Sequence, residues 1–225
     1  MRCRNCGAEL PSGASYCSAC GAPLISSVVQ SPVWNLSFYR IRIKVLAVAR
    51  QFWIEDEDSN SLGYSRQKVL ALKTAIQVYS DERMTQELFM VKQEQYALNW
   101  GIFDVFDSQT NVCLGRLRRK GRSDFGSDQY SILNPAGQEI GTVKEGSRRG
   151  IARRYVPYAN LAPERTTVEM YGREVATINQ RFKMIGNVWE LNCTDLPREV
   201  DRRVLLAFMI VVATVGLHRP GLRVG

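Results

Sequence analysis

The sequence has a single histidine, His218, and no apolar stretch longer than the fourteen residues from Val204 to Leu217. Triad chemistry needs a histidine held between a nucleophile and a carboxylate, and His218 has no such neighbours in the sequence. No Gly-x-x-x-x-Gly-Lys-Ser/Thr loop occurs, which argues against a P-loop nucleotide site. The first residues contain no apolar signal segment, so we do not expect secretion. The chain therefore carries no enzyme signature, and we predict that it is not an enzyme.

The bulk composition indicates a folded chain with a positive charge. At 225 residues and 45% hydrophobic content, there is room for one ordinary domain and a small module. The formal net charge is +8 and the sequence pI is about 9.3. Such a balance favours anionic partners, for example phospholipid headgroups or nucleic acid.

The N-terminus carries the strongest chemical signal. Two Cys-x-x-Cys pairs lie ten residues apart: Cys3, Cys6, Cys17 and Cys20. Four thiolates suit one tetrahedral Zn²⁺ ion, and the glycine after each pair allows the tight turn that such a site needs. Four cysteine ligands leave no open coordination position, so we predict a structural zinc ribbon over residues 1–24. A segment this short would derive most of its folding free energy from the metal.

The two remaining cysteines, Cys113 and Cys193, lie in apolar surroundings typical of strands. We predict that they are buried and unrelated thiols. Cys-x-x-Cys pairs without a signal peptide indicate metal binding rather than a disulfide framework. A reducing cytoplasm is the compartment that this cysteine usage favours.

Residues 25–37 contain no charge and one proline, and we interpret them as a linker. From residue 38 onward the sequence indicates strands. Residues 40–45 alternate charged and apolar side chains with period two, which is typical of a half-buried strand. Short β-rich runs separated by polar turns continue to about residue 192, often with a glycine near the second strand of each pair. This pattern predicts an antiparallel sheet, either closed on itself or folded as a sandwich.

The chain ends in a different pattern. Asp195 and Pro197 resemble the start of a helix, and we predict a helix over residues 198–216. The run from Val204 to Leu217 is apolar on every face, so it must be surrounded by protein or by lipid. Fourteen residues rise about 21 Å, which is less than the roughly 30 Å hydrocarbon core of a bilayer. We therefore predict a buried core helix, with a short tail anchor as the alternative.

Several segments resemble a known family. Residues 68–82, Lys-Val-Leu-Ala-Leu-Lys-Thr-Ala-Ile-Gln-Val-Tyr-Ser-Asp-Glu, and residues 87–92, Glu-Leu-Phe-Met-Val-Lys, resemble the LURP-one-related, phospholipid scramblase-like branch of the tubby C-terminal superfamily. The hairpins at 104–115 and 130–143 resemble its strand–turn–glycine units. The resemblance covers residues 38–217 and leaves 218–225 as a tail. It implies a mainly β fold, with a closed antiparallel barrel of about twelve strands around a hydrophobic C-terminal helix.

The resemblance also implies lipid-related functions. Tubby-type members bind phosphoinositides, and scramblases are reported to move phospholipids with calcium. Asp56, Asp58 and Asn60 imitate the first three ligand positions of an EF-hand loop, but Ser61 replaces the required glycine and Gln67 replaces the bidentate glutamate. We therefore expect a solvated acidic turn here and no calcium site.

Two basic clusters are candidate anion-binding residues. They comprise Arg116, Arg118, Arg119, Lys120, Arg122, Arg148, Arg149, Arg153 and Arg154. Residues 116–154 contain ten Lys or Arg and four Asp or Glu, so this segment carries six of the eight net positive charges. Arginine forks bind phosphate in a bidentate manner, which suggests a site for lipid phosphates or a nucleic-acid backbone. The alternative interpretation is a solvated rim of the barrel.

These observations lead to a functional prediction with two alternatives. We predict a non-enzymatic binding or adaptor module that associates peripherally with anionic lipid headgroups or with a partner protein. The first alternative is a nucleic-acid-binding protein that uses the ribbon and the arginine clusters together. The second is a membrane-associated, scramblase-like protein whose terminal helix lies in lipid.

Overall fold

The computed structural model describes residues 6–9, 17, 19–20, 32–45, 49–68, 75–93, 101–122, 128–145, 165–182 and 187–215. Some predicted site residues lie outside these ranges: Cys3, Arg148, Arg149, Arg153 and Arg154. The backbone of Arg122 is described, but its side chain is not.

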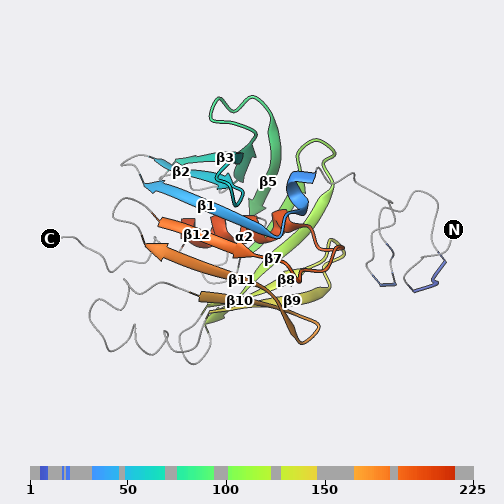
Figure 1. Cartoon of the computed structure of the whole chain (residues 1–225). Coiled ribbons are helices and arrows are strands. Elements are labelled where there is room, and N and C mark those ends of the chain that lie inside the picture. The colour runs from blue at the N-terminus through green and yellow to red at the C-terminus, as the bar shows by residue number, and fades with distance from the viewer. Residues whose placement is uncertain are drawn as a thin grey trace.

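The described residues form a closed barrel of twelve antiparallel strands (Figure 1). The strands are β1 (Phe38–Val45), β2 (Ala49–Glu55), β3 (Ser61–Lys68), β4 (Ala75–Tyr79), β5 (Glu87–Gln93), β6 (Ile102–Asp107), β7 (Cys113–Arg122), β8 (Asp128–Leu133), β9 (Glu139–Glu145), β10 (Arg165–Met170), β11 (Arg173–Phe182) and β12 (Asn187–Asn192). Each strand pairs with the strands before and after it in the sequence, and β1 pairs with β12 to close the ring. The fold confirms the mainly β closed barrel predicted from the resemblance and excludes the sandwich.

Side chains alternate across the barrel wall as the period-two pattern predicts. In β1, Ile41 and Ile43 are buried in the core, whereas Arg42 and Lys44 are exposed on the outer surface. Ile41 lies opposite Trp189 of β12 and opposite Ile54 of β2, so the apolar face continues from strand to strand. The inner face of the wall therefore provides an apolar surface for whatever occupies the barrel.

Helix α2 (Arg202–Val215) occupies the inside of the barrel (Figure 1). Residues 202–211 are buried on every face of the helix, and Leu205, Leu206 and Ala207 have no exposed surface. The helix contacts β6 and β7, and its Phe208 packs edge-on against Tyr130 of β8, with ring centroids 5.1 Å apart. The predicted core helix is thus confirmed. In the described part of the chain, no helix combines the length and the apolar character that crossing a membrane requires.

The start of the helix differs from the prediction. Asp195 does not cap it, because residues 194–200 form turns in which Leu196 N donates to Cys193 O and Val200 N donates to Pro197 O. The cap is Asp201, whose Oδ1 accepts a hydrogen bond from Arg203 N at 2.9 Å. These turns lead the chain from the end of β12 into the barrel. As a consequence, the helix begins at Arg202, four residues later than predicted, and Arg202 and Arg203 lie in its first turn.

Part of the predicted linker packs on the barrel. Residues Pro32–Asn35 form a short 3₁₀ helix, η1, in which Trp34 is buried and meets Phe89 edge-on at 5.7 Å. The Tyr39 hydroxyl fixes this segment, since it donates to Val33 O and accepts from Leu36 N. Burial is the main cause that raises the pKa of Tyr39, so this hydroxyl stays protonated.

Two of the recurring glycines allow close packing inside the barrel. A Cβ atom at Gly115 would lie 3.0 Å from Val204 Cγ2 of helix α2 and 3.2 Å from Leu133 O. A Cβ atom at Gly141 would lie 2.6 Å from Met170 Cγ and 2.8 Å from Glu169 O. A side chain at either position would force the wall outward. Gly115 therefore allows the wall to approach helix α2, and Gly141 allows β9 to pack closely against β10.

A buried ionic network holds the first turn of α2 to the wall. Arg203 Nη1 donates to Asp107 Oδ2 of β6 at 2.6 Å, while its Nε and Nη2 donate to the two oxygens of Asp201 at 3.0 and 2.8 Å. The guanidinium also lies 5.9 Å from the centroid of the Trp34 ring. Arg203 is only 2% exposed, so the two carboxylates balance a charge that has almost no contact with water.

Hydrogen bonds from the loop after β6 help to keep the Asp107 carboxylate ionised. Burial alone would raise its pKa, but hydrogen bonds from Arg203, from Thr110 N and from the Thr110 hydroxyl outweigh burial and lower it. For Arg203, burial opposes the charged form, yet the contacts with Asp201 and Asp107 raise its pKa above the ordinary value. Both partners are therefore ionised in the folded protein.

We expect Asp107→Asn to destabilise the barrel by about 3–5 kcal/mol, because it removes one partner of a buried ion pair and leaves Arg203 with a single carboxylate. Urea unfolding followed by tryptophan fluorescence measures the change. Asp58→Asn is the matched control, since Asp58 is exposed in the turn between β2 and β3 and should change stability by about 0.5 kcal/mol or less. Equal stabilities of the two variants would contradict the network's role.

The lowered pKa of Asp107 also predicts a dependence on pH. A carboxylate with a depressed folded-state pKa stabilises the fold above its unfolded pKa of about 3.9, and this stabilisation is lost as pH falls through the folded pKa. The difference in unfolding free energy between wild type and Asp107→Asn should be constant from about pH 7 to 5 and should shrink below about pH 4. A difference that persists unchanged at pH 3 would refute this expectation.

Candidate metal centre and basic wall of the barrel

Three of the four predicted zinc ligands are described, and they lie together. The sulfur atoms of Cys6, Cys17 and Cys20 are all within 4.8 Å of one another, and Cys6 Sγ is 3.5 Å from Cys17 Sγ. Tetrahedral zinc with Zn–S bonds of about 2.3 Å places its sulfurs about 3.8 Å apart. Cys17 is buried, Cys20 is partly buried and Cys6 is exposed. These distances suit one Zn²⁺ ion bound by this cluster.

The local backbone supports the same site. Gly7 directly follows Cys6 and has a φ of +74°, which is the left-handed conformation that the tight turn requires. Cys3 lies outside the described residues, so its role as the fourth ligand stays a prediction from the sequence. A bound Zn²⁺ would stabilise the ribbon by linking the two halves of the segment. Coordination by four thiolates would leave no open position for a substrate, so such an ion would have a structural role.

Neither of the other two cysteines forms a disulfide among the described residues, but the prediction that both are buried is confirmed only for Cys193. Cys193 is fully buried after β12, and its Sγ lies 3.4 Å from both Leu36 O and Ser37 O. Burial raises the pKa of Cys193 to about 11. Cys113 is partly exposed at the start of β7, and burial is the main cause that raises its pKa as well. Neither thiol is activated as a nucleophile.

The acidic turn after β2 is arranged as a turn and not as a calcium loop. The Asp56 carboxylate accepts hydrogen bonds from Asn60 N and from Asn60 Nδ2, both at 2.8 Å. These contacts lower the pKa of Asp56 and occupy its oxygens within the turn. Among the residues that the structure describes, the cysteine cluster is the only group of three or more candidate metal ligands.

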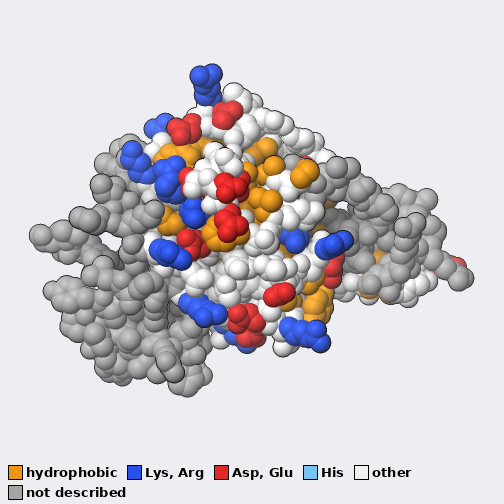
Figure 2. Space-filling model, in the orientation of Figure 1, with side chains coloured by type: hydrophobic (Ala, Val, Ile, Leu, Met, Phe, Trp, Pro, Cys, Tyr) orange, Lys and Arg blue, Asp and Glu red, His pale blue; other side chains and the backbone are white. Residues whose placement is uncertain are grey.

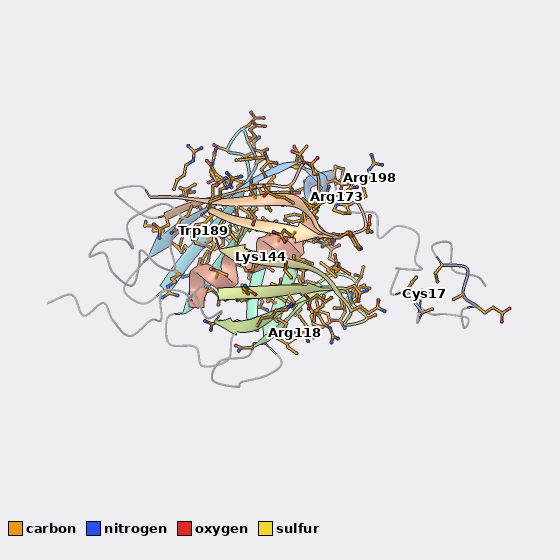
Figure 3. All side chains as sticks on the ribbon, turned by 90° about the horizontal axis from the view of Figure 1, so that it is seen from below. Cys17, Arg118, Lys144, Arg173, Trp189 and Arg198 are labelled. Atoms are coloured by element: carbon orange, nitrogen blue, oxygen red, sulfur yellow. The ribbon has the colours of Figure 1, made fainter. Side chains whose placement is uncertain are left out.

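The described part of the first basic cluster lies on β7, and acidic neighbours accompany it. Arg118 Nη2 and Lys120 Nζ lie 3.3 and 2.6 Å from the carboxylate of Glu139 on β9. The hydrogen bond from Lys120 is the main cause that lowers the pKa of Glu139. Figure 3 shows Arg118 projecting from the outer wall. The two cations therefore share one counter-charge on the barrel surface.

Arg116 and Arg119 are placed differently from these two. Arg116 Nε lies 3.4 Å from Oδ1 of the buried Asp104 on β6, and its side chain is one-third exposed. Arg119 follows the alternation of the strand onto the same face as the buried Leu117. The structure thus does not gather the four described cluster residues into one patch. Arg118 and Lys120 both point outward, and Arg116 lies beside the buried Asp104. Arg119 lies on the inner face of the strand.

The charges on the described surface are mixed in sign. Acidic and basic residues occur in nearly equal numbers within the described ranges. Figure 2 shows red and blue side chains interspersed over one face of the barrel. Most of the excess of basic residues therefore belongs to sequence outside these ranges, including Arg148, Arg149, Arg153 and Arg154.

No residue at either end of α2 is among the site residues predicted from the sequence. Arg202 and Arg203 are nevertheless both buried within the fold. At the opposite end, the buried Arg50 of β2 donates from Nη1 to Thr214 O at 2.7 Å, which satisfies a carbonyl in the last turn of the helix. The signal in the sequence was Asp201, a good cap placed directly before the two arginines.

Comparison with known proteins supports the two parts of the architecture separately. Residues 2–24 match the family of zinc-ribbon domains. An X-ray structure of a protein from Arabidopsis thaliana is similar to the chain with a TM-score of 0.50 and 14% identity, covering 85% of this chain and 99% of that one. At this identity the likeness concerns the fold alone. No curated protein matches the chain in sequence.

We expect Cys17→Ser to reduce bound zinc from one ion per chain to a small fraction of that value, because it removes the buried ligand. Metal analysis of protein purified with zinc measures the loss. Cys113→Ser is the matched control and should retain one ion, since Cys113 lies in the barrel wall. The thermal transition of the barrel should be the same in both variants. Full zinc retention by Cys17→Ser would contradict the assignment.

Proposed function

We propose that the protein is a non-catalytic binding module in which a zinc ribbon is joined to a barrel that associates with anionic phospholipid surfaces. The observation that carries the proposal is the concentration of positive charge between residues 116 and 154, which holds six of the eight net charges. A polybasic segment gains about 1 kcal/mol per Lys or Arg near an anionic membrane. The association is peripheral, because it depends on surface charge.

Helix α2 fills the interior of the barrel, which supports a binding site on the outer surface. Helix α2 occupies the space that other barrels use for a ligand, and its residues 202–211 are buried against the wall. Binding is therefore assigned to the outer surface and to the ends of the barrel. On β7, Arg118 and Lys120 already share Glu139, so they contribute less attraction than their number suggests. The arginines at 148–154 carry the larger part of the attraction in this proposal.

The proposal includes a family assignment. The motifs at residues 68–82 and 87–92 are similar to those of the LURP-one-related, scramblase-like branch of the tubby C-terminal superfamily. The closed barrel around a C-terminal helix agrees with the fold of that family. We assign residues 38–217 to this branch, and we assign the ribbon the role of a separate contact surface for a protein partner.

We expect neutralisation of four arginines, Arg148→Gln, Arg149→Gln, Arg153→Gln and Arg154→Gln, to weaken binding to vesicles containing phosphatidylserine at least tenfold. Co-sedimentation at low ionic strength measures binding, and wild-type binding should itself decrease as salt is raised.

The matched control removes the same charge from exposed residues elsewhere on the barrel: Lys44→Gln, Arg66→Gln, Lys92→Gln and Arg173→Gln. It should weaken binding less than the 148–154 variant does. Absence of wild-type binding at low salt would refute the lipid proposal, and equal losses in the two variants would refute its location.

A further inference from the structure

A pocket of about 500 Å³ lies at the end of the barrel where α2 begins. Its polar lining comes from two segments that are distant in sequence: Asn35, Ser37, Cys193, Thr194, Arg198 and Arg202. The first two belong to η1 and the residues after it, and the others belong to the chain that follows β12 and to the first residue of α2. Figure 3 shows Arg198 at this end of the molecule, next to η1. The pocket is thus formed only when the linker and the helix entry pack together.

Arg202 is the unusual member of this pocket. Arg202 is only 6% exposed. Neither Nε nor Nη1 of its guanidinium has a hydrogen-bond partner. The adjacent Arg203 has a similar burial, but its guanidinium donates to both Asp201 and Asp107. A buried guanidinium with unsatisfied donors destabilises a fold unless a bound group compensates for it.

Among the described residues, no carboxylate balances the charge of Arg202. None of the lining residues is acidic, and the Asp201 carboxylate is occupied by Arg203. The Cys193 thiol lies 3.4 Å from the carbonyl oxygens of Leu36 and Ser37. Burial raises its pKa to about 11, although the charge of Arg202 and a hydrogen bond with it act in the opposite direction, so Cys193 is a neutral contact of Arg202 and not a counter-charge. The N-terminus of α2 adds the positive end of a fourteen-residue helix dipole.

We propose that this pocket binds the phosphate group of a small phosphomonoester. Arg202 supplies a buried guanidinium fork, and Arg198 supplies a second, exposed one. The hydroxyl of Ser37 and the amide of Asn35 are further donors for the remaining phosphate oxygens, whereas the Thr194 hydroxyl donates to Asn192 Oδ1. A phosphomonoester carries a charge of about −1.5 to −2 at neutral pH, which balances two arginines, whereas a carboxylate balances only one.

This inference does not depend on membrane association. The lipid proposal rests on basic residues between 116 and 154, and none of these residues lines the pocket. A phosphate group could come from a soluble metabolite or from the headgroup of a lipid, and the chemistry of recognition is the same. The two proposals can therefore fail separately.

Isothermal titration of the full-length, zinc-loaded protein with glycerol 3-phosphate tests the pocket. Saturable binding at one site per chain is expected, with acetate binding at least tenfold more weakly. Arg198→Gln and Arg202→Leu should each weaken glycerol 3-phosphate binding about tenfold to a hundredfold, as expected for loss of a charge-assisted hydrogen bond. Arg66→Gln removes one exposed charge from β3 and should leave the affinity unchanged.

Stability gives an independent readout. Without ligand, Arg202→Leu should unfold at the same or a higher temperature than wild type, because it removes an unpaired buried charge while keeping an apolar stem. With ligand, the melting temperature of wild type should rise, and that of Arg202→Leu should not. If Arg202→Leu fails to fold, the affinity of Arg198→Gln decides, since Arg198 is exposed. Absence of saturable binding by wild type, or equal affinity in wild type and Arg198→Gln, would overturn the proposal.

Vesicles distinguish the two sources of the phosphate. If the ligand is a lipid headgroup, Arg202→Leu should bind vesicles containing phosphatidic acid less than wild type does, with no such loss on phosphatidylserine vesicles of equal charge. If the ligand is a soluble phosphomonoester, Arg202→Leu should lose glycerol 3-phosphate binding while both vesicle types bind it as they bind wild type.

Discussion

The structure depends on one requirement, which is that the apolar helix α2 must be enclosed by its own chain. Residues 202–211 are buried on all sides, so no face of the helix remains for water. A ring of antiparallel strands satisfies this requirement because its inner face is continuous and has no edge. The close approach at Gly115, where a Cβ atom would lie 3.0 Å from Val204, shows how little space separates wall and helix. The enclosed helix is also the reason why function is sought at the surface and the ends.

Because the helix is enclosed, the charged side chains of its first turn are buried as well. The two arginines of this turn differ in their partners. Arg203 is held between Asp107 and Asp201, which joins the helix to β6 and fixes the point where the chain enters the barrel. Arg202 lies in a pocket without an acidic neighbour and keeps two donor atoms unused. The first arrangement stabilises the fold. The second leaves a buried charge without a carboxylate, and this contrast is the basis for the ligand-binding proposal.

The N-terminal ribbon and the barrel are stabilised by different physical means. The three described cysteine sulfurs of the ribbon lie within 4.8 Å of one another, and a bound metal ion would provide most of the ribbon's folding free energy. The barrel relies on apolar burial and on one ionic network. Several cations of the described outer wall lie beside carboxylates, as Arg118 and Lys120 do around Glu139. A count of basic residues therefore overstates the attraction that the described wall exerts on an anionic surface.

By itself, the sequence determined the features that depend on local spacing. The cysteine pairs predicted the zinc site, the alternation at residues 40–45 predicted a half-buried strand, and the apolar run from Val204 predicted a buried helix. The closed twelve-stranded ring came from family resemblance, because spacing alone left a sandwich open. Only the tertiary structure decided which charges meet: that Asp201 caps the helix instead of Asp195, that Arg203 reaches Asp107 across 96 positions of sequence, and that Arg202 has no carboxylate partner. Such pairings depend on where distant segments pack, and no local pattern records that.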